Sequence, residues 1–112
     1  MKLYGIPNCD TVAKARKYLS EKGQDFEFID FRAEGISAEE LQRAFDALGA
    51  AVFNTRSPSW RNLSPDEQQA LKSGSDLSPA LESPTVIKRP LVFHNNNIFN
   101  GFNADDWQAR GL

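Results

Sequence analysis

The sequence is organised around the stretch Lys2-Leu3-Tyr4-Gly5-Ile6-Pro7-Asn8-Cys9-Asp10-Thr11-Val12. It predicts a short strand over residues 2–6, a tight turn, and a helix that begins at or beside Cys9, the only cysteine in the chain. The first N–H groups of a helix have no partner within the helix, and the helix dipole is positive there. Because this position favours the thiolate, which is the nucleophilic form of cysteine, Cys9 is a candidate reactive group.

The residues that follow complete a β-α-β unit. Apolar residues recur with helical spacing, so we expect a helix over residues 10–22 that ends at Gly23. Aromatic and β-branched residues then predict a second strand over residues 25–31. A strand, a helix and a strand in this order are typical of two parallel strands in one sheet.

A helical insertion is predicted over about residues 37–84. It contains two helices that begin at serines, over residues 37–49 and 64–74, and a short helical piece that follows Ser78-Pro79 and stops near residue 84. Serine is favoured at the first two of these helix starts because its side chain accepts a hydrogen bond from a free N–H of the first helical turn. Residues 50–58 lack clear periodicity and are predicted to form a turn or loop.

The last part of the chain predicts a β-hairpin and a final helix. Residues 91–94 and 98–99 read as strands, and the asparagines between them tolerate the positive φ angles of a turn. Asn103 then occupies the N-cap position of a helix. The element order indicates an α/β protein with a thioredoxin-like (glutaredoxin-like) fold, in which the insertion separates the β-α-β and β-β-α halves of a four-stranded mixed sheet. No linker divides the chain, so residues 1–112 are predicted to form a single domain.

Composition narrows the possible functions. The chain has 112 residues, is 40% hydrophobic and 25% charged, and has no apolar run of the roughly 20 residues that a membrane span needs. Its N-terminal residues lack a secretory signal, so a cytoplasmic location is expected. A single cysteine excludes an internal disulfide, and one cysteine and one histidine, far apart in the sequence, are too few for the usual zinc sites. A net charge of −2 gives no general reason to bind nucleic acid.

Cys9 also has a simpler interpretation, because free cysteines are often just small buried residues. Its place in a strand–turn–helix favours reactivity, since open α/β sheets bind ligands at the carboxyl ends of their strands. The carboxylate of Asp10 disfavours a second negative charge beside it. We therefore expect the thiolate to need a cation from elsewhere in the fold.

Arginines are the candidate cations. Arg89 precedes Pro90 and lies between two apolar segments that are predicted to be strands, so its charged group must reach solvent or a ligand. An ordinary arginine on an edge strand, followed by a trans proline, fits the sequence equally well. The Arg89-Pro90 bond can be cis or trans. Arg56 lies among small polar residues that suit contact with an anion; a solvated surface charge is the simpler interpretation, and Arg61 competes for the role.

Other candidate residues have structural interpretations. His94 is far from Cys9 in the sequence and is not expected to act as its base. Trp60 and Trp107 are expected to pack in the core or at its rim. The first helix carries a basic cluster that is expected to form a solvated face, consisting of Lys14, Arg16 and Lys17.

Three motifs together resemble the arsenate reductase (ArsC)/Spx family, and most closely its short YffB-type branch. They are Pro7-Asn8-Cys9-Asp10-Thr11, Asn54-Thr55-Arg56 and Lys88-Arg89-Pro90-Leu91-Val92. The resemblance extends over essentially the whole chain. It implies a thioredoxin-like fold with a nucleophilic cysteine at the start of the first helix, two arginines that hold an oxyanion, and a cis proline.

The resemblance also implies a chemistry. In glutathione- and glutaredoxin-dependent arsenate reductases, the cysteine attacks arsenate and is released through a mixed disulfide with glutathione. Because this chain has no second cysteine, the resolving thiol must be external. We therefore expect a glutathione-dependent thiol reductase with no bound cofactor, glutathione as co-substrate and glutaredoxin as an implied partner. Its predicted residues are Cys9 and Arg89 for catalysis, and Asn8, Thr11, Arg56, Arg89 and Pro90 for binding the substrate or glutathione.

Departures from the family pattern leave alternatives open. Residues 98–102 lack the third oxyanion arginine of arsenate reductases, Gly5 replaces a histidine, and Val12 replaces a serine. Losing one bidentate charged contact costs on the order of 1.5–3 kcal/mol of binding free energy for arsenate, so at most weak arsenate reduction is expected. The other alternative is an Spx-like regulator that binds the RNA polymerase α subunit, although Val12 stands where such proteins often carry a second cysteine.

Overall fold

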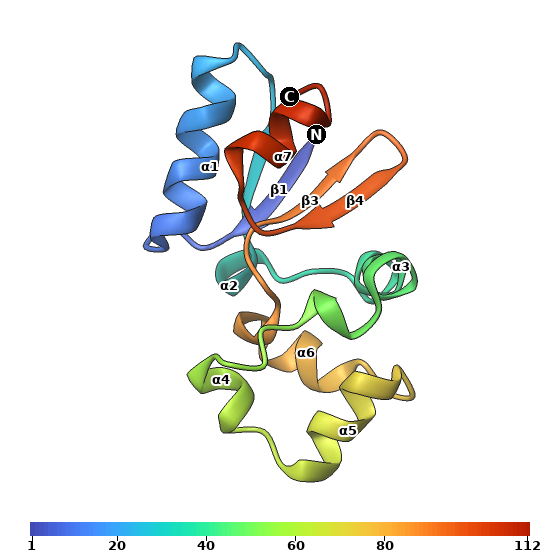
Figure 1. Ribbon diagram of the computed structural model, residues 1–112. Helices are drawn as coiled ribbons and strands as arrows, with labels where there is room; N and C mark the ends of the chain where they lie inside the picture. The colour runs from blue at the N-terminus through green and yellow to red at the C-terminus, as the bar shows by residue number, and fades with distance from the viewer. The chain divides into compact units, whose positions relative to one another are not determined.

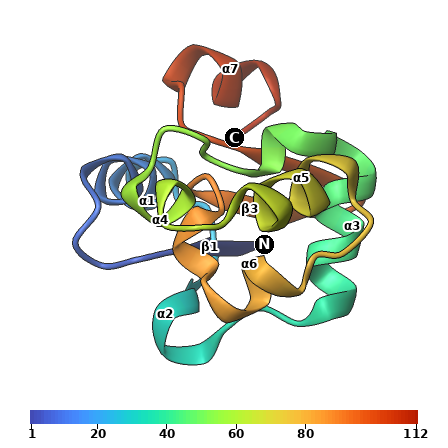
Figure 2. The same ribbon diagram turned by 90° about the horizontal axis from the view of Figure 1, so that it is seen from below.

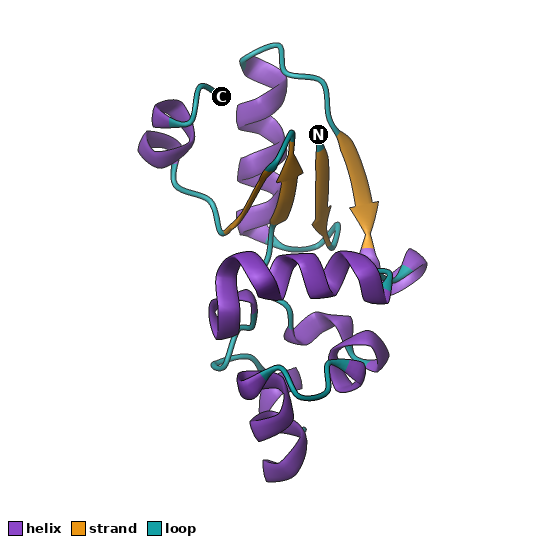
Figure 3. Cartoon of the chain, turned by 90° about the vertical axis from the view of Figure 1, so that its right-hand side faces the viewer, coloured by secondary structure: helices purple, strands orange, loops and turns teal.

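The protein consists of two compact units. The computed structural model describes residues 1–112 (Figure 1). The sheet unit comprises Met1–Asp30 and Arg89–Leu112, and the helical unit comprises Phe31–Lys88. All four strands belong to the sheet unit, whereas the helical unit consists of helices and loops (Figure 3). That the whole chain folds as a single domain stays a prediction.

The sheet unit contains the predicted four-stranded mixed sheet. Its strands are β1 (Lys2–Gly5), β2 (Glu27–Asp30), β3 (Leu91–His94) and β4 (Asn97–Asn100), in the order β2-β1-β3-β4. β1 runs parallel to β2, while β3 runs antiparallel to both β1 and β4. The thioredoxin-like fold class predicted from the element order is therefore confirmed.

Two helices cover one face of this sheet, namely α1 (Asp10–Glu21) and α7 (Ala104–Ala109) (Figure 1). Trp107 of α7 is completely buried, and its Nε1 donates a hydrogen bond to the carbonyl of Gly101 at 3.2 Å. The Asn103 side chain caps α7, as predicted, by accepting a bond from the N–H of Asp106 at 3.0 Å. The core between helices and sheet consists of Leu3, Val12, Ala15, Leu19, Val92, Phe99, Trp107 and Leu112.

The second strand is shorter than predicted. It ends at Asp30, and Phe31 instead begins the single-turn helix α2 (Phe31–Glu34). Phe31 is completely buried, and its carbonyl accepts a bond from the N–H of Gly35 at 2.9 Å. The aromatic residues that suggested a longer strand also suit a buried turn of helix, and one turn is too short to show a periodicity of its own.

The helical unit contains the three predicted helices and several shorter turns (Figure 2). Ser37 accepts the N–H of Glu40 at 3.0 Å, and Ser64 forms a reciprocal capping box with Glu67. Both serines therefore begin helices, as predicted. After α2, the elements of this unit in order are α3 (Ala38–Leu48), η1 (Gly49–Val52), α4 (Pro58–Arg61), α5 (Pro65–Ser73), α6 (Ser78–Glu82) and η2 (Pro84–Val86).

One expectation for this unit is confirmed and another was wrong. Residues 50–58 form short turns, as predicted: they include most of η1, the hydrogen-bonded turn around Arg56 and the first residue of α4, which is capped by Ser57. The apolar segment before Arg89 is not a strand, since it forms η2 and only Ile87 makes an isolated bridge to Phe53. Such short turns carry no periodic signal.

No helix of the chain has the length and apolar character that crossing a lipid bilayer requires.

Candidate functional site

Cys9 lies in the turn between β1 and α1, where it is the N-cap residue of α1. Its backbone is extended, with φ −107° and ψ 123°, and its carbonyl accepts the first helical hydrogen bond from the N–H of Ala13 at 2.9 Å. The side chain makes no capping hydrogen bond. The thiol is free, half-buried and packed against the edge of the core. The thiol is thus held at a helix N-terminus, and the side chain does not form the hydrogen bond by which N-cap residues usually stabilise a helix.

Gly5 and Val12 hold the strand and the helix on either side of Cys9 close together. A Cβ atom added to Gly5 would lie 2.8 Å and 3.0 Å from the two γ-methyl carbons of Val12, which is too close for carbon atoms. Val12 is completely buried and belongs to the core. A side chain at position 5 and the branched side chain at position 12 therefore exclude each other in this packing. The glycine and the valine, noted separately in the sequence, form one structural arrangement.

Arg89 and Pro90 lie at the same end of the sheet as Cys9. Leu91, the residue after Pro90, pairs with Tyr4 near the carboxyl end of β1, just before the turn that carries Cys9. The Arg89-Pro90 peptide bond is cis, and the Pro90 carbonyl accepts the N–H of Gly101 at 2.9 Å. Arg89 is half-buried. The structure thus places the predicted catalytic arginine beside the strand that leads to the thiol.

The remaining predicted residues of the sheet unit flank Cys9 or lie away from it. Asn8 precedes Cys9 in the turn and Thr11 lies in the first turn of α1, both with exposed side chains; their binding roles stay predictions. His94 ends β3 at the opposite end of the sheet, which agrees with leaving it unpaired with Cys9. Its Nδ1 atom is buried without a hydrogen-bond partner. No group of three or more potential metal ligands occurs in the chain.

Arg56 belongs to the helical unit, where it lies in a hydrogen-bonded turn before α4. The backbone N–H of Arg56 donates to Oδ1 of Asn54 at 3.1 Å, and the Ser57 hydroxyl donates to the Asn54 carbonyl at 2.9 Å. Arg56 lines a pocket of about 380 Å³ together with Ala51, Phe53, Asn54, Thr55 and Lys88. The competing Arg61 ends α4 and does not line this pocket. Lys88 was not predicted as a site residue, although it stands in the third family motif.

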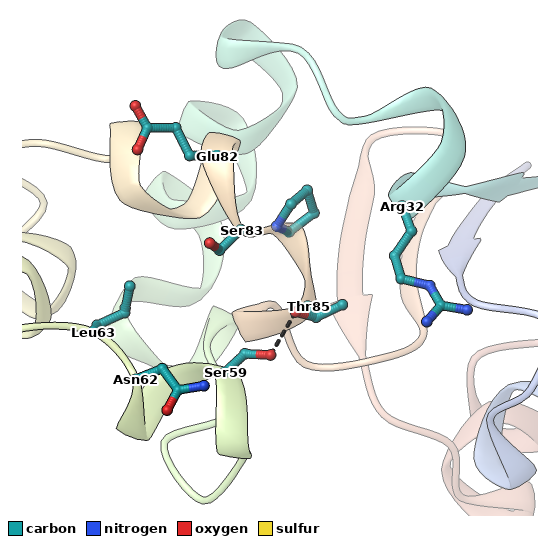
Figure 4. A pocket seen from close by; sticks show the side chains of 8 residues that line it. Arg32, Ser59, Asn62, Leu63, Glu82, Ser83 and Thr85 are labelled. Atoms are coloured by element: carbon teal, nitrogen blue, oxygen red, sulfur yellow. Dashed lines mark hydrogen bonds between the residues drawn. The ribbon is translucent and has the colours of Figure 1, made fainter.

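A second pocket of the helical unit has a different lining (Figure 4). Its volume is about 440 Å³, and the hydroxyls of Ser59 and Thr85 share a hydrogen bond of 2.6 Å at its wall. Arg32 and Glu82 lie on opposite sides of it, so it presents both signs of charge. No residue of this pocket was predicted from the sequence. The lining residues are Arg32, Ser59, Asn62, Leu63, Glu82, Ser83, Pro84 and Thr85.

Comparison with known proteins identifies the family. The chain matches the model of the ArsC family over residues 4–110. It belongs to the ArsC family. A protein of Haemophilus influenzae, named only as uncharacterized, is 38% identical over 108 residues that cover 96% of this chain and 95% of that protein. The global transcriptional regulator Spx of Streptococcus agalactiae is 28% identical and is covered to 80% of its length.

Solved structures agree with this assignment. A YffB protein has 33% sequence identity to this chain and a TM-score of 0.88, with 96% of both chains covered. An arsenate reductase (ArsC) related protein from Brucella melitensis has 31% identity and a TM-score of 0.72, covering 96% of this chain and 91% of that one. The predicted family resemblance is therefore confirmed for ArsC family members in general and for the YffB type in particular.

Proposed function

We propose that this ArsC family protein is a glutathione-dependent thiol reductase in which Cys9 is the nucleophile. The observation that carries the proposal is the state of Cys9, a free, half-buried thiol at the N-terminus of α1 that makes no capping bond. A helix N-terminus stabilises negative charge, and the thiolate is the form that attacks disulfides. Arg89 lies at the same end of the sheet and is the proposed cation for this site.

The chemistry needs two external thiols, because Cys9 is the only cysteine. The Cys9 thiolate attacks one sulfur of a substrate disulfide, so that a new S–S bond forms to Cys9 while the other sulfur leaves as a thiolate and takes up a proton. A glutathione thiolate then attacks the mixed disulfide, which frees the second substrate thiol and leaves glutathione attached to Cys9. A second glutathione releases Cys9 and forms glutathione disulfide. Two glutathione molecules are oxidised for each disulfide reduced.

The neighbouring residues have proposed roles in binding. Arg89 would form a charge-assisted bond to a carboxylate of glutathione, while Asn8, Thr11 and Pro90 would contact its backbone. Arg56 of the helical unit is the proposed ligand of an anionic group. Glutaredoxin is the proposed protein partner for the release step, since it exchanges glutathione with protein thiols.

Mass spectrometry after incubation with glutathione disulfide tests this proposal. We expect the wild-type protein to gain one glutathione at Cys9, and Cys9→Ser to gain none. The rate should fall roughly tenfold in Arg89→Ala and recover partly in Arg89→Lys, because lysine restores the charge but not the planar guanidinium. If folded wild-type protein reacts with glutathione disulfide or iodoacetamide no faster than the urea-unfolded chain, Cys9 is not an activated nucleophile and the proposal fails.

Arsenate reduction is a second candidate activity, favoured by the related protein from Brucella melitensis. We propose that any such activity is weak, because Gly5, Val12 and the arginine-free segment after β3 remove groups that hold arsenate in the family pattern. A coupled assay with glutathione, glutaredoxin and arsenate measures it. A turnover rate with arsenate equal to that with disulfides would contradict this ranking.

A regulatory function is the alternative that the Spx relative favours. The candidate contact surface for such a function is the basic cluster of α1, which consists of Lys14, Arg16 and Lys17. Two residues of this cluster already have partners within the sheet unit. Arg16 lies over the ring of Phe28 at 4.1 Å, and Lys17 is 3.9 Å from Glu21. Titration with the purified C-terminal domain of the RNA polymerase α subunit separates the two functions. Saturable binding that Lys14→Glu weakens would support the regulator.

A further inference from the structure

The Arg56–Lys88 pocket of the helical unit, defined by its six lining residues, is positively charged without any acidic residue. We propose that it binds an anion with at least two negative charges, and that Lys88 supplies the second cation beside Arg56. The inference rests on the proposed role of Arg56 and extends it with a residue and a ligand class. The shared chemistry is a group with several charged oxygens, such as a tetrahedral oxyanion or a pair of carboxylates.

No carboxylate lines the pocket to offset the two positive charges. The side chains of Arg56 and Lys88 are both exposed. Neither Arg56 nor Lys88 takes part in the ion pairs Lys17–Glu21 and Arg110–Asp106, which lie in the sheet unit. A ligand that enters the pocket therefore meets two cations without first displacing a carboxylate.

The backbone holds the two cationic segments beside each other. Phe53 and Ile87 form an antiparallel bridge. The Asn54 N–H donates to the Val86 carbonyl at 2.8 Å, and the Lys88 N–H donates to the Val52 carbonyl at 2.9 Å. These bonds tie the segment that leads into the Arg56 turn to the segment that ends at Lys88. Because the framework is formed in advance, binding has to order only the two side chains.

The arrangement of the donors favours a ligand with more than one charge. A guanidinium binds two oxygens of one anion in a fork, whereas an ammonium acts as a point charge. A singly charged anion would offset only one of the two positive charges and leave the pocket with a net positive charge. An anion with two charges compensates both. The second pocket, with Arg32 and Glu82 in its lining, offers no such selectivity for negative charge.

Nuclear magnetic resonance titration with sulfate tests the inference, with chloride at the same ionic strength as the singly charged comparison. We expect saturable shifts of the backbone amides of Thr55, Arg56 and Lys88 with sulfate only. Lys88→Gln and Arg56→Gln should each raise the dissociation constant roughly tenfold. Lys88→Arg should retain binding. The matched control Arg61→Gln removes an exposed arginine of the same unit outside the pocket and should bind as the wild type does.

Three results would overturn the inference: no saturable shift with sulfate, wild-type affinity in Lys88→Gln, or an equal loss in Arg61→Gln. Glutathione and its diethyl ester then distinguish the sources of the anion, because only the free carboxylates should compete with sulfate. The exchange of Cys9 with uncharged hydroxyethyl disulfide tests the proposed function separately. Sulfate binding with an inert Cys9 would defeat the proposed function alone, and a reactive Cys9 without sulfate binding would defeat this inference alone.

Discussion

The sheet unit and the helical unit hold their candidate functional residues by different means. In the sheet unit, close packing of Gly5 against Val12 fixes the strand and helix that flank Cys9. In the helical unit, hydrogen bonds of Asn54 and Ser57 shape the turn that presents Arg56. Packing tolerates little change in volume, whereas a hydrogen-bonded turn on the surface can lose one bond and persist. Substitutions should therefore affect folding more strongly in the first unit and ligand affinity more strongly in the second.

The largest expected effect is that of Trp107→Ala in the sheet unit. The indole is completely buried and lies edge-on to the rings of Phe99 and Phe102, with centroids 5.6 Å and 4.9 Å away. Truncation should lower the free energy of unfolding by about 3–5 kcal/mol, measured by chemical denaturation. Amide hydrogen exchange should rise in both units if the chain is one cooperative domain. A rise confined to the sheet unit would show that the units unfold separately.

Gly5→Ala should have the next largest effect. The added methyl group would meet Val12 at 2.8 Å, and such overpacking typically costs about 1–3 kcal/mol of stability. Gly5→Ala/Val12→Ala should recover part of that loss relative to the two single variants, as a double-mutant cycle measures. Additive losses would mean that the two residues do not interact, and that packing does not set the geometry around Cys9.

Ser57→Ala tests the helical unit. Ser57 is 5% exposed, accepts the N–H of Trp60 at 3.1 Å and donates to the Asn54 carbonyl, so its loss should cost about 1–2 kcal/mol. Ser64→Ala is the matched control, because it removes a helix cap away from the pocket. Both variants should be less stable than the wild type, but only Ser57→Ala should weaken sulfate binding. Equal sulfate affinity in the two would show that the turn does not position Arg56.

The smallest expected effect is a pH dependence at the start of α6. The backbone N–H of Ser78, with a further bond from its hydroxyl, lowers the pKa of Asp76 below its usual value of 3.8. The charged form is thus favoured by folding, so its contribution to stability is present above the unfolded pKa and is lost as pH falls through the lowered one. Asp76→Asn should be slightly less stable at neutral pH and equal to the wild type near about pH 2. A difference that persists at low pH would exclude this titration as its cause.

The sequence was sufficient to predict an element wherever its local signals, such as capping residues and hydrophobic periodicity, agreed with the fold. Ser64, Pro65 and Glu67 specified a helix start that needs no distant partner, and Gly23 ended α1 with a φ of +69°. Hydrophobic periodicity was enough for α1 and α3. Cys9 could be proposed from one strand–turn–helix pattern because the helix terminus itself defines its environment.

The structural features that could not be predicted from the sequence depend on contacts between distant segments or are very short elements. The single turn of α2 and the 3₁₀ turns η1 and η2 are too short for a periodic pattern. Lys88 becomes a neighbour of Arg56 only through the bridge between Phe53 and Ile87, which links residues far apart in the sequence. The mutual exclusion of side chains at Gly5 and Val12 likewise follows from packing that no spacing rule describes.

The strand order has a consequence for solubility. β2 and β4 form the two margins of the sheet, and each is only four residues long. A strand of that length spans roughly 13 Å, which offers few unpaired amides to another chain. Carboxylates at Glu27 and Asp30 mark one margin, while Asn97 and Asn100 mark the other. Short, polar margins of this kind disfavour strand-to-strand aggregation, so the protein should tolerate the concentrations that titration experiments require.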